Sequence, residues 1–271
     1  MPGLTWTQVS RYRRALLSPH RVRSKREALR FVNALGFCYA FTPGPGELPG
    51  LFDVLATRSV NRMWSQTWQW KDELATDRRL YYGRLLKRKP TFVSMRYLPH
   101  FFSLTGNAGE PDDYAQAYHE GRLSLLAKEI YEYVRAAGPC STWRLRKQFV
   151  VHADRAGAFH RALRMLQERC LIAKVAEQDS GSYAYIWDTF QRWLPEAVRD
   201  AGSITMKTAA VRVLERYVRT VGAVRVREAA ELFEWPAVIF MQAMRSLPRT
   251  VSISDIDGQE ILVHAACVTT P

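Results

Sequence analysis

The sequence has few of the features that mark exported, membrane-spanning or disulfide-bonded proteins. It contains four cysteines among 271 residues, far apart and without a CxxC pair, and it has no run of 18 apolar residues. The N-terminus lacks the apolar segment of a signal peptide. We therefore expect a cytoplasmic protein without a membrane span, with buried structural thiols at Cys38, Cys140, Cys170 and Cys267.

The motifs of common catalytic and cofactor sites are also missing. The six histidines show neither HxxxH nor HExxH spacing, and the sequence has no P-loop, GxGxxG or GxSxG. The loop around Gly44 and Gly46 contains prolines, which lack the backbone N–H groups that a phosphate cradle requires. The sequence therefore predicts neither a bound metal nor a cofactor.

Positive charge is abundant and lies mostly at one end of the chain. The formal net charge is +13, and residues 1–100 hold 18 Lys and Arg against 6 Asp and Glu. Residues 101–271 are almost balanced, with 21 basic and 20 acidic side chains. This asymmetry predicts a polyanionic partner for the first hundred residues.

The second half of the chain contains an internal repeat. Tyr133-Val134-Arg135, Gly138 and Phe149 recur 84 residues later as Tyr217-Val218-Arg219, Gly222 and Phe233. At an offset of 81, the pattern Phe159-x-x-Ala162-Leu163-Arg164-x-Leu166 recurs from Phe240 to Leu247. A β-rich stretch with turn residues follows each copy, broken at Asp179-Ser180-Gly181-Ser182 and at Asp257-Gly258. Two copies of one helical unit with a hairpin predict two winged helix-turn-helix units.

The first hundred residues fit a third, divergent copy of this unit. Ser24 and Glu27 predict a helix that ends at Gly36. Further helices are expected over Leu51–Arg58, over the basic segment Asp77–Lys89 and over Tyr97–Leu104, with a strand at Thr91–Met95. The predicted fold is therefore mainly α with small β-hairpins (α+β), built as three tandem winged helices over 1–110, 111–196 and 197–271.

Basic side chains in the first two units are the candidate DNA contacts. We expect them to bind mainly phosphates, with little base discrimination. They are Arg21, Arg23, Lys25, Arg26, Arg84, Lys87, Arg88, Lys89, Arg144, Arg146, Lys147, Arg161 and Arg164. The second unit's recognition helix is expected over Asp154–Arg169. The corresponding helix Trp235–Leu247 is mostly apolar, which favours a structural role or protein contacts over base contacts.

Asp72 and Glu73 are the only adjacent carboxylates in the basic region. A carboxylate beside an apolar wall can act as a general base that activates water, whereas such a pair in most proteins caps a helix or pairs with arginines. Both interpretations stay open for this pair.

Three winged units, the segment Leu35-Gly36-Phe37 and the connector Trp193-Leu194-Pro195-Glu196 together resemble the AlkZ/YcaQ family of DNA glycosylases. The resemblance implies a concave basic channel for duplex DNA and cleavage of the N-glycosidic bond of alkylated or crosslinked purines. The family's Gln-apolar-Gln or Gln-apolar-Asp signature falls on Tyr39-Ala40-Phe41, and its downstream Trp-x-His-like segment falls on Trp70-Lys71-Asp72, without the histidine.

Three hypotheses follow. The first is duplex DNA binding in DNA repair, at damaged DNA and without the family's catalytic residues, with Tyr39, Phe41 and Trp70 as aromatic wedges or as core. The second is a monofunctional DNA N-glycosylase that uses Asp72 or Glu73. The third is a protein-interaction module, for which Val238 and Met241 must be exposed. We expect a cytoplasmic, nucleoid-associated monomer that needs no cofactor.

Overall fold

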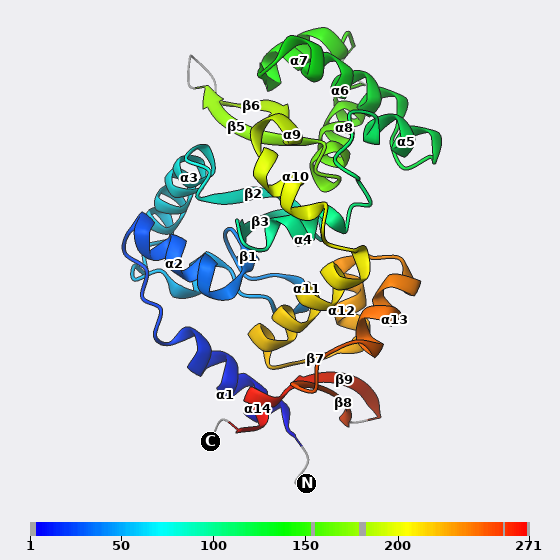
Figure 1. The fold of residues 1–271 in the computed structure, drawn as a ribbon. Coiled ribbons are helices and arrows are strands. Elements are labelled where there is room, and N and C mark those ends of the chain that lie inside the picture. The colour runs from blue at the N-terminus through cyan, green and yellow to red at the C-terminus, as the bar shows by residue number, and fades with distance from the viewer. Residues whose placement is uncertain (1–3, 153–154, 179–182, 257, 270–271) are drawn as a thin grey trace.

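The computed structural model describes residues 4–152, 155–178, 183–256 and 258–269. It contains three small antiparallel sheets of three strands each, distributed along a mainly helical chain (Figure 1). All three sheets have the same strand order, in which the last strand lies between the other two: β1-β3-β2, β4-β6-β5 and β7-β9-β8. The predicted α+β fold with three repeated units is therefore confirmed.

The first unit begins with helix α2, and along the chain β1 precedes helix α3 while β2 and β3 follow it. Its elements are α2 (Lys25–Leu35), β1 (Phe37–Tyr39), the 3-10 turns η1 (Pro45–Glu47) and η2 (Leu51–Val54), α3 (Val60–Thr76), β2 (Leu80–Leu86) and β3 (Lys89–Ser94). Ser24 caps α2 through the backbone N–H of Glu27, as predicted. The helix expected over Leu51–Arg58 is only the short turn η2.

The prediction of a basic helix over Asp77–Lys89 is wrong. Its residues form strand β2 and the turn into β3, where Lys87 and Arg88 both have positive φ. Leu80 and Tyr81 are buried on the strand, and two consecutive left-handed residues cannot continue a right-handed helix. The cationic run therefore lies at the tip of a hairpin.

The second and third units follow the order helix, strand, two helices and hairpin, which is the order of a winged helix. The second unit consists of α6 (Leu125–Ala137), β4 (Cys140–Ser141), α7 (Thr142–Phe149), α8 (Ala156–Glu168), β5 (Ile172–Gln178) and β6 (Ala184–Thr189). The third consists of α11 (Met206–Val221), β7 (Ala223–Arg225), α12 (Val226–Phe233), α13 (Ala237–Arg245), β8 (Val251–Ile256) and β9 (Gln259–His264). The predicted turn residues 179–182 and 257, and Asp154, lie outside the described residues.

The sequence repeat corresponds to equivalent packing. Tyr133 contacts Phe149 edge-to-face, and Tyr217 contacts Phe233 in the same way. Gly138 and Gly222 end α6 and α11 with φ of 78° and 77°, a left-handed conformation that favours glycine. The repeated residues therefore fix the helix end and the pairing of the two helices around it.

Short helices connect the units. They are α4 (Leu98–Ser103), α5 (Asp113–His119), α9 (Phe190–Trp193) and α10 (Pro195–Ala201). The largest core cluster runs from Phe37 and Tyr81 of the first unit, through Phe102 and Phe190, to Tyr217 of the third. The first and third units therefore share a continuous apolar core, whereas most of the apolar residues of the second unit form a core of their own.

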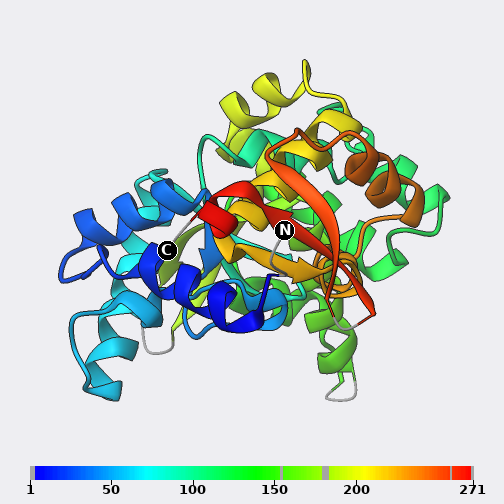
Figure 2. The ribbon, with the colours of Figure 1, turned by 90° about the horizontal axis from the view of Figure 1, so that it is seen from below.

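Helix α1 (Trp6–Leu17) packs on the third unit, beside α14 (Ala265–Thr269) (Figures 1 and 2). The Tyr12 hydroxyl donates to the Arg219 carbonyl at 2.6 Å, and Arg13 donates to the carbonyls of Val221 and Ala223. These contacts bring the two ends of the described chain to the same side of the molecule. All four cysteines are buried, as expected.

Candidate functional site

A buried ionic cluster joins the first unit to the second. Asp72 on α3 accepts hydrogen bonds at Oδ1 from the ammonium groups of Lys71 and Lys174, and at Oδ2 from the Tyr183 hydroxyl at 2.8 Å. Lys174 lies on β5 and also donates to Glu177 at 2.8 Å. The exposed fractions of Lys71, Asp72 and Lys174 are 0%, 6% and 4%, so the pairing is shielded from water. The cluster therefore ties α3 to the hairpin of the second unit.

Burial also perturbs the protonation of this cluster. Loss of hydration lowers the pKa of Lys71 to about 8, and the neighbouring Asp72 opposes that shift. Burial, followed by the hydrogen bond to the Asp72 carboxylate, raises the pKa of Tyr183. Tyr183 therefore stays a hydrogen-bond donor at neutral pH, while Lys71 loses its proton more readily than an ordinary lysine.

Aromatic rings cover the cluster. The Lys71 ammonium lies 4.1 Å from the centroid of the Trp68 ring, a cation–π distance. Trp68 also contacts Phe41 and Tyr183, with ring centroids 6.1 and 5.4 Å apart. Even so, Trp68 and Tyr183 remain 41% and 39% exposed. The cluster thus holds exposed aromatic side chains in fixed positions.

Two adjoining cavities lie between the first and second units, and both are lined by Thr142, His160 and Tyr185. The first, called here the tryptophan cavity, has a volume of about 360 Å³ and adds Trp68, Trp143, Arg146, Tyr183 and Ala184. The second, called here the arginine cavity, has a volume of about 410 Å³ and adds Tyr82, Arg84, Leu163, Arg164, Gln167 and Trp187. Together they form one groove bordered by α3, β2, α7, α8 and β6.

The groove gathers three of the candidate DNA contacts. Arg84 comes from β2, Arg146 from α7 and Arg164 from α8, so both units contribute. Arg146 lies 3.5 Å from the ring of His160, measured between Nη1 and Nε2. Arg144, Lys147 and Arg161 are exposed on the same two helices, outside the lining of the groove.

Cations at the hairpin tip are partly neutralised. Lys87 lies 3.5 Å from a carboxylate oxygen of Glu234, and Arg88 lies 3.9 Å from one of Glu168. Lys89 instead lies over the ring of Tyr39.

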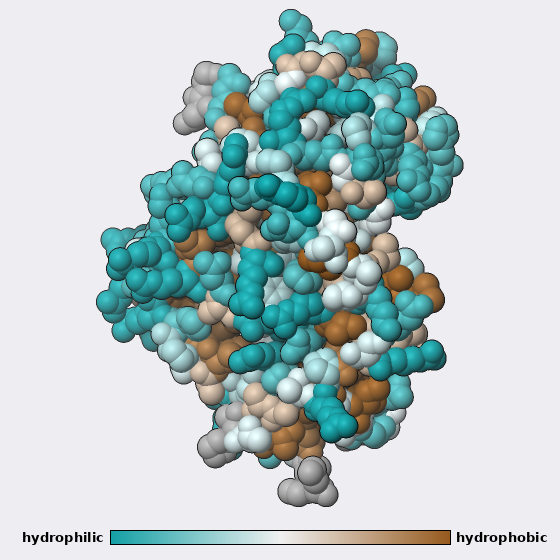
Figure 3. Space-filling model, viewed as in Figure 1, coloured by the Kyte–Doolittle hydropathy of each residue, from teal (hydrophilic) through white to brown (hydrophobic). Residues whose placement is uncertain are grey.

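The remaining candidates lie around the start of α2. Arg21, Arg23 and Arg26 are exposed there and line neither cavity, whereas Lys25 pairs with Glu73 at 2.6 Å. Of the candidate contacts in the first hundred residues, Arg84 alone lines the groove. Arg21, Arg23 and Arg26 lie on a separate surface, in a mainly hydrophilic region over α2 and α3 (Figure 3).

The two candidate carboxylates already have partners. Asp72 accepts hydrogen bonds from three donors inside the cluster. Glu73 lies outside the cluster, where one carboxylate oxygen pairs with Lys25 and the other accepts a hydrogen bond from Gln69 at 2.7 Å. These bonds lower the pKa of Glu73, with the Lys25 hydrogen bond as the largest cause. Such pairing corresponds to the structural interpretation of the Asp72-Glu73 dipeptide.

Residues at the family-signature positions are packed into the interior. Tyr39 is 1% exposed and donates its hydroxyl to the Pro45 carbonyl, and Trp70 is 7% exposed. Phe41, 9% exposed, stacks on Trp64 with ring centroids 4.9 Å apart. Tyr39 and Trp70 therefore belong to the core, and the aromatic rings that reach solvent in this region are Trp64 and Trp68.

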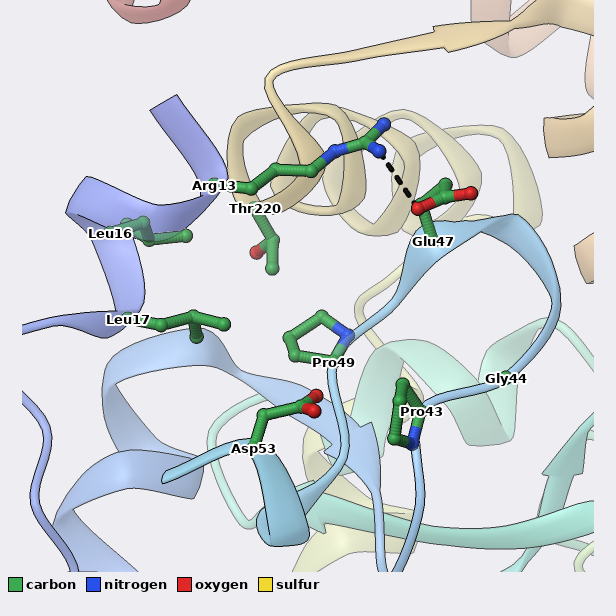
Figure 4. A pocket seen from close by; sticks show the side chains of 9 residues that line it. All are labelled: Arg13, Leu16, Leu17, Pro43, Gly44, Glu47, Pro49, Asp53 and Thr220. Carbon is green, nitrogen blue, oxygen red and sulfur yellow. Dashed lines mark hydrogen bonds and ion pairs between the residues drawn. The ribbon is translucent and has the colours of Figure 1, made fainter. Parts of the chain in front are cut away.

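A further cavity of about 380 Å³ lies between α1, the η1 loop and α11 (Figure 4). Its strongest polar feature, the Arg13 guanidinium, is already bound to Glu47 at 2.8 Å and to two backbone carbonyls. Arg13 thus fastens α1 to its neighbours. Within the described ranges, no three His, Cys, Asp or Glu side chains are grouped to hold a metal ion, and no helix is long and apolar enough to span a membrane.

The sequence analysis missed Lys71, Lys174, Trp68, Trp143 and Tyr183. One signal was available: Lys174 interrupts the apolar strand Ile172-Ala173-Lys174-Val175, and a charged residue in such a strand needs a buried partner. The convergence of the aromatic side chains from two units had no local signal.

The model of a family described as AlkZ related matches residues 22–234. Among solved structures, the DNA glycosylase AlkZ of Streptomyces sahachiroi superposes with a TM-score of 0.59 at 12% identity, over 99% of this chain and 73% of that chain. No curated protein sequence matches. At this identity the structural likeness concerns the fold.

Proposed function

Since the chain belongs to the AlkZ-related family, we propose that it binds duplex DNA in a DNA-repair role, at damaged sites. The main support for this proposal is the groove between the first two units, where Arg84, Arg146 and Arg164 lie beside exposed aromatic rings. No Asp or Glu is among the described residues that line it, although Glu168, outside the lining, lies 4.0 Å from Arg164. Arginines bind phosphates through bidentate hydrogen bonds, and aromatic rings suit distorted DNA.

A salt titration of binding tests this function. Each phosphate contact lowers the logarithm of the association constant by about 0.9 per tenfold rise in salt concentration. Replacing Arg84 or Arg164 by Gln should weaken binding to any duplex sequence and reduce the salt slope by about one each. Arg227→Gln is the control, because Arg227 is an exposed arginine on α12, outside the groove. Affinity that barely changes with salt in the wild type would contradict the proposal.

The second candidate is a DNA N-glycosylase acting on alkylated or crosslinked purines. It is supported by the family match, although the signature positions Tyr39 and Phe41 carry no group that activates water. Asp72 or Glu73 would then have to act as the base, and both are engaged in hydrogen bonds. Release of base from N7-alkylguanine duplexes would favour this function, provided that Asp72→Asn or Glu73→Gln abolishes release in folded protein.

A protein-interaction role for the third unit is favoured by one observation. Val238 and Met241 on α13 are 60% and 44% exposed, and apolar residues gather on this part of the surface (Figure 3). Exposed apolar patches on soluble proteins often mark contact sites. Substituting both residues by Ser should then leave DNA affinity unchanged while abolishing any association that a pull-down reveals.

A further inference from the structure

We propose that the tryptophan cavity receives a single unpaired nucleobase of DNA, stacked on Trp68 and Trp143. This inference rests on the proposed DNA-binding function and assigns a subsite within it. Trp68 and Trp143 are 41% and 50% exposed, and both line the same cavity from different units. A base can reach such a cavity only after leaving its helical stack.

On the first-unit side of the cavity, the Trp68 ring and the neighbouring Tyr183 ring are held in place before any ligand arrives. Lys71 lies at 4.1 Å from the Trp68 ring centroid, and the Tyr183 hydroxyl is fixed by Asp72 at 2.8 Å. Because these side chains are positioned by buried charges, little rotamer entropy is lost when a base stacks on them. Stacking tolerates every base, since each presents a π-face.

Polar groups at the cavity wall favour a base over an apolar occupant. Thr142 is already engaged, since its hydroxyl accepts from the Trp187 indole at 2.9 Å and donates to the Tyr185 carbonyl at 3.0 Å. Arg146 and His160 are therefore the side chains available for the edge of a base, and guanidinium donors match the ring-nitrogen and carbonyl acceptors found there.

The neighbouring arginine cavity favours a base that is part of a nucleic acid, because its cations can bind the phosphates beside that base. Arg84 and Arg164 line it, and the two cavities share Thr142, His160 and Tyr185. A nucleotide with its base in the tryptophan cavity thus has cations nearby for its phosphates. Glu168 lies 4.0 Å from Arg164, so an aromatic side chain of a protein partner would leave Arg84 as the arginine of this cavity without a counter-charge among the described residues.

The test compares one duplex that carries a single-nucleotide bulge with the same duplex fully paired. The wild type should bind the bulged duplex about tenfold more tightly, equivalent to ~1.4 kcal/mol. Trp68→Ala and Trp143→Ala should abolish this preference, so that each variant binds the bulged and the paired duplex with equal affinity. Trp64→Ala is the matched control, since Trp64 lies one turn before Trp68 on α3 and is 44% exposed but does not line the cavity.

Photocrosslinking gives a measurement that does not depend on any variant folding. With 5-iodouracil as the bulged base, the wild type should crosslink at Trp68, Trp143 or Tyr183. Equal affinity for the two duplexes, or a crosslink at Trp64, would overturn the subsite while salt-dependent duplex binding still supports the proposed function. Failure to bind either duplex would overturn both.

Discussion

Replacing Asp72 by Asn should strongly destabilise the contact between α3 and β5. The substitution keeps the shape of the side chain but removes the charge that faces two ammonium groups, both almost completely buried. Breaking a buried ion pair by removing one partner costs about 3–5 kcal/mol. Asn also offers one acceptor oxygen where Asp offers two, so at least one of the three donors loses its partner.

The lower end of that range applies here. Lys174 keeps Glu177 at 2.8 Å, and Lys71, whose pKa is already lowered to about 8, can release its proton instead of remaining a buried unpaired cation. We therefore expect a loss of about 3 kcal/mol. For a chain of this size that corresponds to a fall in melting temperature of roughly 6–12 °C.

Urea unfolding followed by circular dichroism measures this loss. Asp77→Asn is the matched control, because Asp77 ends the same helix and lies 3.7 Å from Lys25 at the surface, where the loss should stay below about 0.5 kcal/mol. Adding Lys71→Met to Asp72→Asn should restore part of the stability by removing one unpaired cation. An Asp72→Asn loss as small as that of Asp77→Asn would refute the structural role assigned to Asp72.

Two further predictions concern stability. Burial lowers the pKa of Lys71 from 10.5 to about 8, so between these pH values the unfolded chain binds a proton that the folded chain lacks. As pH rises from 8 to 10.5, the wild type should therefore gain stability relative to Lys71→Met, by up to ~1.4 kcal/mol per pH unit. A difference in unfolding free energy that stays constant over this range in urea titrations would contradict this. Gly222→Ala and Gly138→Ala share the same positive φ, but an added Cβ at Gly222 would lie 2.5 Å from the Tyr12 ring, whereas at Gly138 the nearest atom, Arg192 Nη1, is 3.8 Å away. Gly222→Ala should therefore cost about 1 kcal/mol more and speed proteolysis of α1, and equal losses would show that α1 does not depend on this contact.

The assignment of Asp72 also decides how an activity assay is interpreted. A loss of base excision in Asp72→Asn identifies a catalytic base only if the variant keeps its fold, because the same change is expected to loosen the groove. Glu73→Gln is the cleaner catalytic test, since Glu73 pairs at the surface with Lys25.

Local patterns in the sequence predicted much of the architecture. The Tyr, Gly and Phe spacing at an offset of 84 identified two equivalent units, because each of these residues serves a contact within its own unit. The basic segment Asp77–Lys89 was misread as a helix because strand β2 buries adjacent residues, Leu80 and Tyr81, and so lacks the regular alternation of a strand. The turn at Lys87 and Arg88 has two residues with positive φ, neither of which is a glycine.

By itself, the sequence determined the repeated helical units, the glycine helix ends and the concentration of positive charge, because these depend on spacing and composition over short stretches of chain. Only the tertiary structure decided which charges face each other. Lys174 lies 102 residues from Asp72, and Trp143 lies 75 residues from Trp68, so no local pattern could indicate that the first pair forms an ion pair or that the second lines one cavity. The groove exists because buried charges and aromatic rings from two units pack together across that distance.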